Sequence, residues 1–279
     1  MRILRKSVHT AAAVATVGLV ALAMTEPANA RSPGAAVSHA PKPTVVLLHG
    51  AWADGSSWAP VTEKLQRQGY TVDVPPDPLR GVAADATYLR AYLDQIKGPI
   101  VLVGHSYGGM VITAAATGDP DVTALVYVDA YIPDTGDTVD ALTRAKPGSA
   151  LAVTDGAQVF RSVPIPDGGG NPDLYIRPEL FPGIFAASLP GRQTAVLAAS
   201  QRPLTGSATT EPLAGAPAWR TIPSWAVIGT DDKVIPAAEQ QVMTARAGAH
   251  VVTVKAPHLS MLARPDTVTD LITRAATGR

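Results

Sequence analysis

Residues 100–117 read IVLVGHSYGGMVITAAAT and contain a G-x-S-x-G motif at residues 104–108. The apolar residues at 100–103 are typical of a strand buried on both faces of a parallel sheet, and those at 110–117 favour a buried helix. A serine in so tight a turn needs neighbours without Cβ atoms, and the turn lifts its hydroxyl above the carboxyl edge of the sheet. Ser106 is therefore the candidate nucleophile, and the backbone N–H of Tyr107 is a candidate oxyanion donor.

Short apolar segments recur along the rest of the chain and alternate with helical patterns. Strands are predicted at residues 44–48, 70–74, 100–103, 124–128, 225–228 and 251–255. Helices are predicted at residues 58–68, 84–96 and 265–275. This alternation indicates an α/β fold, with a mostly parallel sheet of about six strands that helices cover on both faces.

One long segment, residues 131–223, interrupts the alternation and is rich in proline and glycine. A connection of that length is uncommon inside a compact domain unless it has a function. Its aromatic residues argue against disorder, because disordered segments are poor in aromatic side chains. They are Phe160, Tyr175, Phe181, Phe185 and Trp219. We expect this segment, placed between the fifth and sixth strands, to form a cap over the site at the carboxyl edge of the sheet.

The first 30 residues have the layout of a secretory signal peptide. A basic opening precedes an apolar run at residues 11–24, and small residues at 28 and 30 provide a cleavage site after Ala30. The apolar run is shorter than the roughly 20 residues that a membrane-spanning helix needs, which disfavours a retained anchor. We therefore expect a secreted or extracytoplasmic protein without a stable membrane anchor. A flexible leader at residues 31–43 would precede one domain at residues 44–279.

Composition excludes several other classes of protein. The chain has no cysteine, so neither a disulfide nor a lipid anchor on cysteine can form. Removal of residues 1–30 takes three basic side chains and one acidic side chain from a chain with 23 of each, which leaves a net charge of −2. No run of lysine or arginine remains, so the chain has no electrostatic basis for binding nucleic acid.

A serine hydroxyl becomes a good nucleophile only when a base within hydrogen-bonding distance accepts its proton. In an open α/β sheet the chemistry lies at the carboxyl ends of the strands. His258 follows the last predicted strand at that edge, whereas His250 precedes the strand at the opposite end. Inside the motif, His105 is expected to point away from the serine, and His49 is expected to fix the loop of the second oxyanion donor. His258 is therefore the predicted base.

The carboxylate that orients this histidine should lie on a loop at the same edge. Asp231 and Asp232 follow the strand at residues 225–228, and Asp129 follows the strand at residues 124–128. The chain order serine, aspartate, histidine admits all three positions. Only one member of the adjacent pair can face His258, and spacing alone leaves the choice open.

The combined motifs resemble those of the α/β-hydrolases, close to the compact group of plant methylesterases, hydroxynitrile lyases and small bacterial esterases. The resemblance spans residues 44–279 and is carried by VVLLHGAW at 45–52, GHSYGG at 104–109, GTDD at 229–232 and APHLSML at 256–262. It implies that Asp232, the last residue of a G-x-x-D turn, is the acid. It also implies that the backbone N–H groups of Ala51 and Tyr107 form the oxyanion hole. The family's antiparallel edge strands before the H-G strand have no room here, so we expect a smaller sheet.

Motifs and resemblance together predict an exported serine esterase that hydrolyses small to medium apolar esters through Ser106, His258 and Asp232. This chemistry needs no metal and no cofactor, and the sequence has no His-Glu-x-x-His motif. A carbon–carbon or hydroxynitrile lyase and a cofactor-free perhydrolase are alternatives on the same three residues. A non-catalytic binding protein is the alternative from another class. The natural ester and the oligomeric state are not predicted.

Overall fold

A computed structural model describes residues 42–279 of the chain. The predicted signal peptide at residues 1–30 lies outside the described residues, and so does the predicted leader at 31–43 except for its last two residues. Both therefore stay predictions, as do the domain boundaries drawn from them. Within residues 42–279, no helix has both the length and the apolar character that crossing a membrane requires.

The centre of the fold is a six-stranded sheet in which every neighbouring pair is parallel, in the order β2-β1-β3-β4-β8-β9. The strands are β1 (Thr44–Leu48), β2 (Val72–Asp73), β3 (Ile100–His105), β4 (Val122–Val128), β8 (Ser224–Gly229) and β9 (His250–Val254). All six residues of β3 are buried, as a central strand covered on both faces requires. The predicted α/β-hydrolase architecture is thus confirmed, although β2 is shorter than expected.

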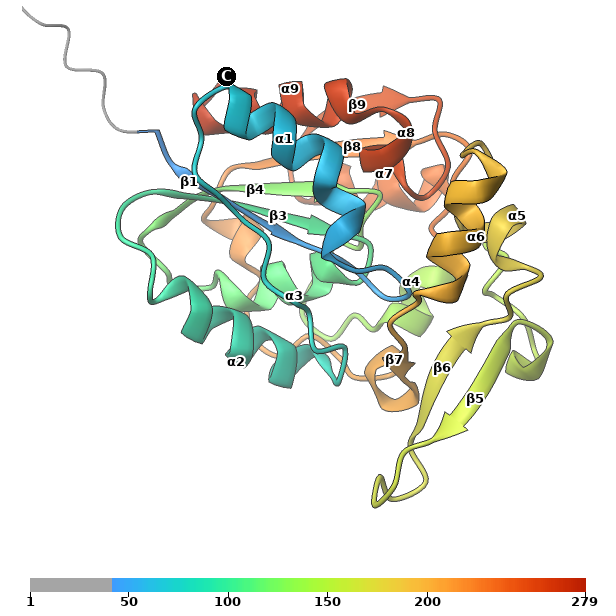
Figure 1. Cartoon of the computed structure of the whole chain (residues 1–279). Coiled ribbons are helices and arrows are strands. Elements are labelled where there is room, and N and C mark those ends of the chain that lie inside the picture. The colour runs from blue at the N-terminus through green and yellow to red at the C-terminus, as the bar shows by residue number, and fades with distance from the viewer. Residues whose placement is uncertain (1–41) are drawn as a thin grey trace, which may run out of the picture. The chain divides into compact units, whose positions relative to one another are not determined.

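Helices cover both faces of this sheet (Figure 1). They are α1 (Ala59–Arg67), α2 (Val82–Leu93), α3 (Gly108–Ala115), α7 (Ala237–Arg246), α8 (Ser260–Ala263) and α9 (Pro265–Ala276). In Figure 1, α1 and α9 lie side by side on one face, and α2 and α3 lie on the other. The buried apolar residues of α9 recur at helical spacing and face the sheet; they are Val268, Leu271, Ile272 and Ala275. Helix α7 is an element that the sequence prediction did not include.

The long insertion lies between β4 and β8, which are the fourth and fifth strands of the main sheet along the chain. The prediction that placed it between the fifth and sixth strands is therefore wrong in its strand count. The insertion contains α4 (Val139–Ala145), α5 (Phe181–Phe185), α6 (Gly191–Ala199), β5 (Phe160–Pro164), β6 (Pro172–Ile176) and β7 (Leu204–Thr205). Four 3₁₀ helices complete the secondary structure of residues 42–279, at Gly55–Trp58, Gly156–Gln158, Gly206–Thr209 and Ala218–Arg220.

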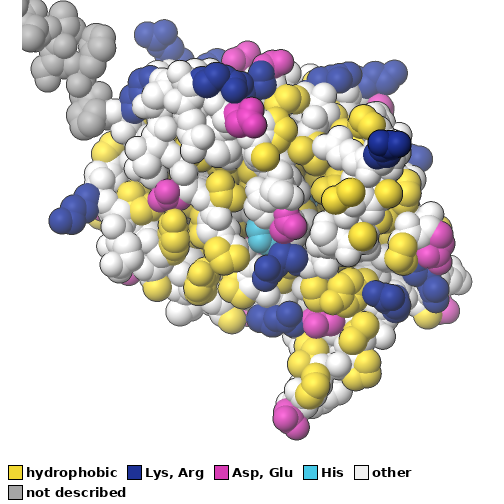
Figure 2. Space-filling view, viewed as in Figure 1, with side chains coloured by type: hydrophobic (Ala, Val, Ile, Leu, Met, Phe, Trp, Pro, Cys, Tyr) yellow, Lys and Arg dark blue, Asp and Glu magenta, His cyan; other side chains and the backbone are white. Residues whose placement is uncertain are grey.

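Strands β5, β6 and β7 form a separate antiparallel sheet that the sequence prediction missed. Their residues are mostly half-buried or exposed, so the hydrophobic pattern that identifies the core strands is absent. The β5–β6 hairpin projects from the body of the molecule (Figure 1). On the face shown in Figure 2, hydrophobic side chains are interspersed with polar ones and extend onto the projecting hairpin.

Candidate active site

The G-x-S-x-G motif forms the turn between β3 and α3. Ser106 has a φ of +54°, in the left-handed region that residues with a side chain rarely adopt. Helix and strand approach closely on either side of it, because a Cβ atom added to Gly104 would lie 2.7 Å from the carbonyl oxygen of Gly108. The backbone of Ser106 is held by hydrogen bonds to neighbouring segments, from its N–H to Val128 O (3.3 Å) and from Tyr131 N–H to its oxygen (3.2 Å).

The side chains of Ser106 and His258 meet above this turn. His258 lies in the loop between β9 and α8, and its Nε2 is 2.8 Å from Ser106 Oγ. Both residues are buried, with exposed fractions of 0% for His258 and 1% for Ser106. The loop after β9 therefore reaches the carboxyl end of β3 and brings His258 to Ser106. The strand topology predicts this for His258 but not for His250, which lies at the other end of β9.

Asp232 lies on the other side of the imidazole. Its Oδ2 is 2.8 Å from His258 Nδ1. The same carboxylate accepts hydrogen bonds from the backbone N–H groups of Val234 (2.7 Å) and Ile235 (3.0 Å) and from Gln240 Nε2 (2.8 Å). Its neighbour Asp231 is exposed and does not reach the histidine. Three donors thus orient the carboxylate of Asp232 toward His258.

Asp129, the competing acid, has different partners. It accepts hydrogen bonds from Gly229 N–H (2.8 Å), Ser260 N–H (2.8 Å) and Ser260 Oγ (3.0 Å). These bonds join the end of β8 to the start of α8, so Asp129 holds together the two segments on either side of His258. Burial raises the pKa of Asp129 to about 7, and the nearby Asp232 carboxylate contributes to the increase.

His105, whose side chain was expected to point away from Ser106, lies beside His258. Its Nε2 donates to the backbone oxygen of His258 (2.8 Å), and the two ring centroids are 4.8 Å apart. Burial lowers the pKa of His105 well below its ordinary value, so its ring stays neutral. No sequence spacing signals this contact, because it joins two residues that are distant in the chain. His250 lies at the start of β9, with its ring centroid 5.3 Å from that of Trp225.

The loop after β1 packs directly against the serine turn. A Cβ atom added to Gly50 would lie 2.7 Å from Ser106 Cβ and 3.0 Å from the backbone nitrogen of Tyr107. The next residue, Ala51, is buried. Among the residues that the structure describes, neither Ala51 N–H nor Tyr107 N–H donates a hydrogen bond to another protein group. Both predicted oxyanion donors therefore belong to segments that meet at Ser106, and both amides are available to a ligand.

Aromatic side chains enclose the histidine. The ring of Phe185, on α5 of the insertion, is edge-on to His258 with centroids 4.8 Å apart. Trp52 lies next, with its centroid 6.3 Å from that of Phe185 and 5.5 Å from that of Phe160. The insertion therefore covers the site, as expected of a cap. The sequence analysis did not identify Trp52, although it directly follows the H-G-A segment.

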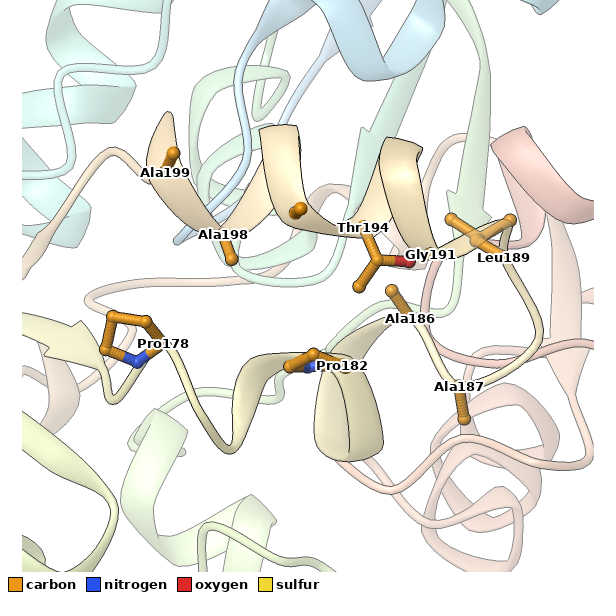
Figure 3. Close-up of a pocket in the computed structure, with 10 residues that line it drawn as sticks. Pro178, Pro182, Ala186, Ala187, Leu189, Gly191, Thr194, Ala198 and Ala199 are labelled. Atoms are coloured by element: carbon orange, nitrogen blue, oxygen red, sulfur yellow. The ribbon is translucent and has the colours of Figure 1, made fainter.

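A cavity of about 500 Å³ lies between α5 and α6 (Figure 3). Its lining is mostly apolar and includes Pro178, Pro182, Ala186, Leu189, Thr194 and Ala198. Ala186, which lines the cavity, directly follows Phe185, whose ring contacts His258.

The arrangement as a whole is a hydroxyl, an imidazole and a carboxylate in a hydrogen-bonded chain. In such a chain the imidazole can take the hydroxyl proton while the carboxylate holds its tautomer, which activates serine for attack on a carbonyl carbon. Across residues 42–279, no group of three or more His, Cys, Asp or Glu side chains is placed to hold a metal ion.

Comparisons with known proteins identify the family to which this fold belongs. A family model described as the alpha/beta hydrolase family matches residues 45–271. A carbendazim hydrolyzing esterase of Nocardioides sp. (strain SG-4G) is 37% identical over 110 residues, which are 35% of this chain and 46% of that enzyme. This match therefore spans less than half of the relative's length.

Two longer matches are more distant. A pyrethroid hydrolase of Sphingobium wenxiniae (strain DSM 21828 / CGMCC 1.7748 / JZ-1) is 28% identical over 254 residues, covering 82% of this chain and 85% of that protein. The crystal structure of a pyrethroid hydrolase from Sphingobium faniae JZ-2 superposes with a TM-score of 0.65 at 24% identity, over 84% of this chain and 97% of the other. At that identity, the structural likeness shows the fold alone.

The raised pKa of Asp129 predicts a specific dependence of stability on pH. The native state keeps a proton on this carboxyl up to about pH 7, whereas an unfolded aspartate loses it at about pH 4. Between these values the native state binds more protons, so the contribution of Asp129 to the free energy of unfolding falls as the pH rises. An Asp129→Asn variant lacks this titration. Its free energy of unfolding, taken relative to the wild type, should therefore increase from pH 4 to pH 7.

Urea unfolding of both proteins across that pH range measures the difference. Asp231→Asn, which changes the exposed carboxylate of the adjacent turn, is the control for a general effect of charge removal. If the difference in free energy of unfolding between Asp129→Asn and wild type stays constant from pH 4 to pH 7, the raised pKa of Asp129 is contradicted.

Proposed function

This chain belongs to the alpha/beta hydrolase family, and from that premise we propose that it is a serine hydrolase that cleaves carboxylic esters. One observation carries the proposal: the buried chain of 2.8 Å hydrogen bonds from Asp232 through His258 to Ser106. Family membership alone does not determine a reaction, since one fold supports many chemistries. The names of the relatives, a carbendazim hydrolyzing esterase and a pyrethroid hydrolase, support the esterase class.

In the proposed first half-reaction, Ser106 Oγ attacks the ester carbonyl carbon and its proton passes to His258 Nε2. Asp232 holds the other imidazole nitrogen and stabilises the imidazolium, without itself accepting the proton. The three backbone and side-chain donors on Asp232 support this role, because they keep its carboxylate in place while the charge on the imidazole changes.

The N–H groups of Ala51 and Tyr107 are assigned the role of stabilising the negative charge that forms on the carbonyl oxygen. Each such donor contributes roughly 3 kcal/mol to stabilising the tetrahedral intermediate. His258 then gives its proton to the leaving alcohol, and the carbon–oxygen bond to that alcohol breaks. Water, deprotonated by His258, attacks the acyl-enzyme, and the acid is released with Ser106 restored.

The proposed substrates are small to medium esters with an apolar portion. The aromatic side chains around His258 and the apolar cavity between α5 and α6 support this preference, because neither region offers a charged partner. Because only 1% of Ser106 is exposed, the proposal includes a movement of the insertion that admits the ester. Phe185 is the aromatic side chain that must be displaced, since it lies on His258.

The proposed location is outside the cytoplasm, after removal of a signal peptide. The support is the basic, apolar and small-residue pattern of residues 1–30. The absence of cysteine is compatible with an exported protein whose core, rather than disulfides, provides its stability.

Replacement of the proposed catalytic groups should remove ester turnover. Ser106→Ala and His258→Ala should each lower kcat for short-chain p-nitrophenyl esters by about 10⁴-fold or more, because neither proton transfer nor acyl transfer can proceed. A fluorophosphonate probe should add once to the wild type, on the peptide that contains Ser106, as peptide mass spectrometry would detect.

Two matched controls make this test specific. Ser57→Ala changes another buried serine, and His250→Ala changes the histidine at the opposite end of β9. Both variants should retain wild-type turnover and labelling. Wild-type protein with neither turnover nor a Ser106 adduct would refute the esterase proposal.

Export should leave a mature protein that begins at Arg31. In a bacterial host that secretes it, the intact mass and the N-terminal sequence of the extracytoplasmic protein measure the cleavage site. Changing Ala28 and Ala30 together to leucine should block cleavage, because the signal peptidase site requires small residues. Recovery of unprocessed wild-type protein from the cytoplasm would contradict export.

A further inference from the structure

Two buried acids lie behind the oxyanion donors and are not part of the proposed reaction. Asp77 is in the loop between β2 and α2, and Asp85 is in the first turn of α2; both are fully buried. Helix α2 packs beside α3, which starts just after the serine turn (Figure 1). Buried carboxyl groups are costly unless they are hydrogen-bonded, so this pair requires an explanation.

Asp85 is bonded to the residue that follows the serine. Its Oδ2 accepts a hydrogen bond of 2.8 Å from the hydroxyl of Tyr107, a side chain that is 1% exposed. The same carboxylate accepts from the backbone N–H groups of Arg80 (3.0 Å) and Gly81 (3.2 Å). The Tyr107 side chain therefore connects α2 to the peptide group whose N–H is assigned to the oxyanion hole.

Asp77 is linked to the other donor segment. Its backbone N–H donates to His49 Nε2 (3.0 Å), so the proton of the neutral His49 ring is on Nδ1. That Nδ1 lies 3.0 Å from the oxygen of Gly50, the residue before Ala51. The backbone around Asp77 thus determines the tautomer of His49, and the ring in turn binds the loop that carries the second oxyanion donor.

The two acids complete the connection between these segments. Asp77 Oδ2 is buried and has no donor among the described residues, while its carboxyl group faces Asp85. Burial raises the pKa of Asp77 well above its ordinary value, and the Asp85 carboxylate raises it further. Burial raises the pKa of Asp85 as well, but its hydrogen bonds from Arg80, Gly81 and Tyr107 oppose that increase. A proton held by this pair therefore lies on Asp77, whose carboxyl can donate it to Asp85. One continuous polar network then runs from Tyr107 through both acids to His49 and Gly50.

We propose that Asp85 is a positioning residue for ester hydrolysis. Its hydrogen bond to the Tyr107 hydroxyl holds the Tyr107 N–H at the oxyanion. Its link through Asp77 and His49 aligns the Tyr107 N–H with the N–H of Ala51. This inference rests on the proposed esterase function. The turn at Ser106 is strained, with a φ of +54°, so the peptide after it needs an anchor to keep its N–H aimed at the substrate. The competing explanation is that Asp85 only caps α2, through Arg80 and Gly81.

Tyr107→Phe separates these explanations, because it removes the hydroxyl and leaves the capping bonds of Asp85 intact. Loss of a whole oxyanion donor lowers kcat by about 10²- to 10³-fold. A donor that is present but loosely held should lower kcat less than a missing donor does. We expect kcat for a p-nitrophenyl ester to fall about tenfold. KM should change less than twofold, since the hydroxyl does not touch the substrate.

A tetrahedral analogue provides a second readout that a purely structural role would not change. A trifluoromethyl ketone forms a hemiketal on Ser106 whose oxygen occupies the oxyanion hole, whereas the product carboxylate binds without forming a tetrahedral centre. Tyr107→Phe should raise the inhibition constant of the ketone by about the factor by which it lowers kcat. The inhibition constant of the product should remain unchanged.

The matched control is Tyr127→Phe. Tyr127 is also buried, and its hydroxyl is 2.9 Å from Thr113 Oγ1, in the interface between β4 and α3. Both variants lose one buried hydroxyl and its hydrogen bond, so thermal unfolding should show comparable losses of stability. Only Tyr107→Phe should lose turnover and affinity for the ketone.

Each outcome of these measurements either supports or overturns the positioning role. Wild-type kcat and ketone affinity in Tyr107→Phe would overturn the positioning role while leaving the esterase function in place. A proportional loss of both, with Tyr127→Phe unaffected, would establish it. Wild-type protein without any turnover would refute the proposed function, and the positioning role would fall with it.

Discussion

The strained turn at Ser106 is the constraint on which the rest of the structure depends. A left-handed conformation at a residue with a side chain costs on the order of 1–3 kcal/mol and persists only where its surroundings enforce it. Here the end of β3 and the start of α3 approach so closely that residue 104 has no room for a Cβ atom. Because the backbone determines where Oγ lies, the serine hydroxyl meets His258 Nε2 at 2.8 Å.

Burial then assigns different roles to chemically identical side chains. Asp232 has four hydrogen-bond partners, one of them the imidazole of His258, and is held in place to orient that ring. Asp129 lies nearby, accepts three hydrogen bonds that join β8 to α8, and has a raised pKa because it is fully buried. The aromatic rings of the insertion exclude water from this region, which strengthens every electrostatic interaction within it.

Local patterns predicted the sheet and the Ser106–His258 pair, because a buried strand, a glycine turn and a last-strand loop each have short-range signatures. They did not separate Asp232 from Asp129, since both follow strands at the same edge; the family resemblance pointed to Asp232, the residue on which the hydrogen bonds converge. The β5-β6-β7 sheet was missed because its strands are half-exposed. The contact of His105 with His258 was missed because it joins residues that are far apart in the chain.

The most direct test of this account is a crystal structure of the protein after reaction with a fluorophosphonate. The account predicts a covalent bond from phosphorus to Ser106 Oγ, with the phosphoryl oxygen within hydrogen-bonding distance of both Ala51 N–H and Tyr107 N–H. It also predicts that Phe185 has moved away from His258 to admit the alkyl group. An adduct on another residue, or a phosphoryl oxygen that neither amide contacts, would contradict the account.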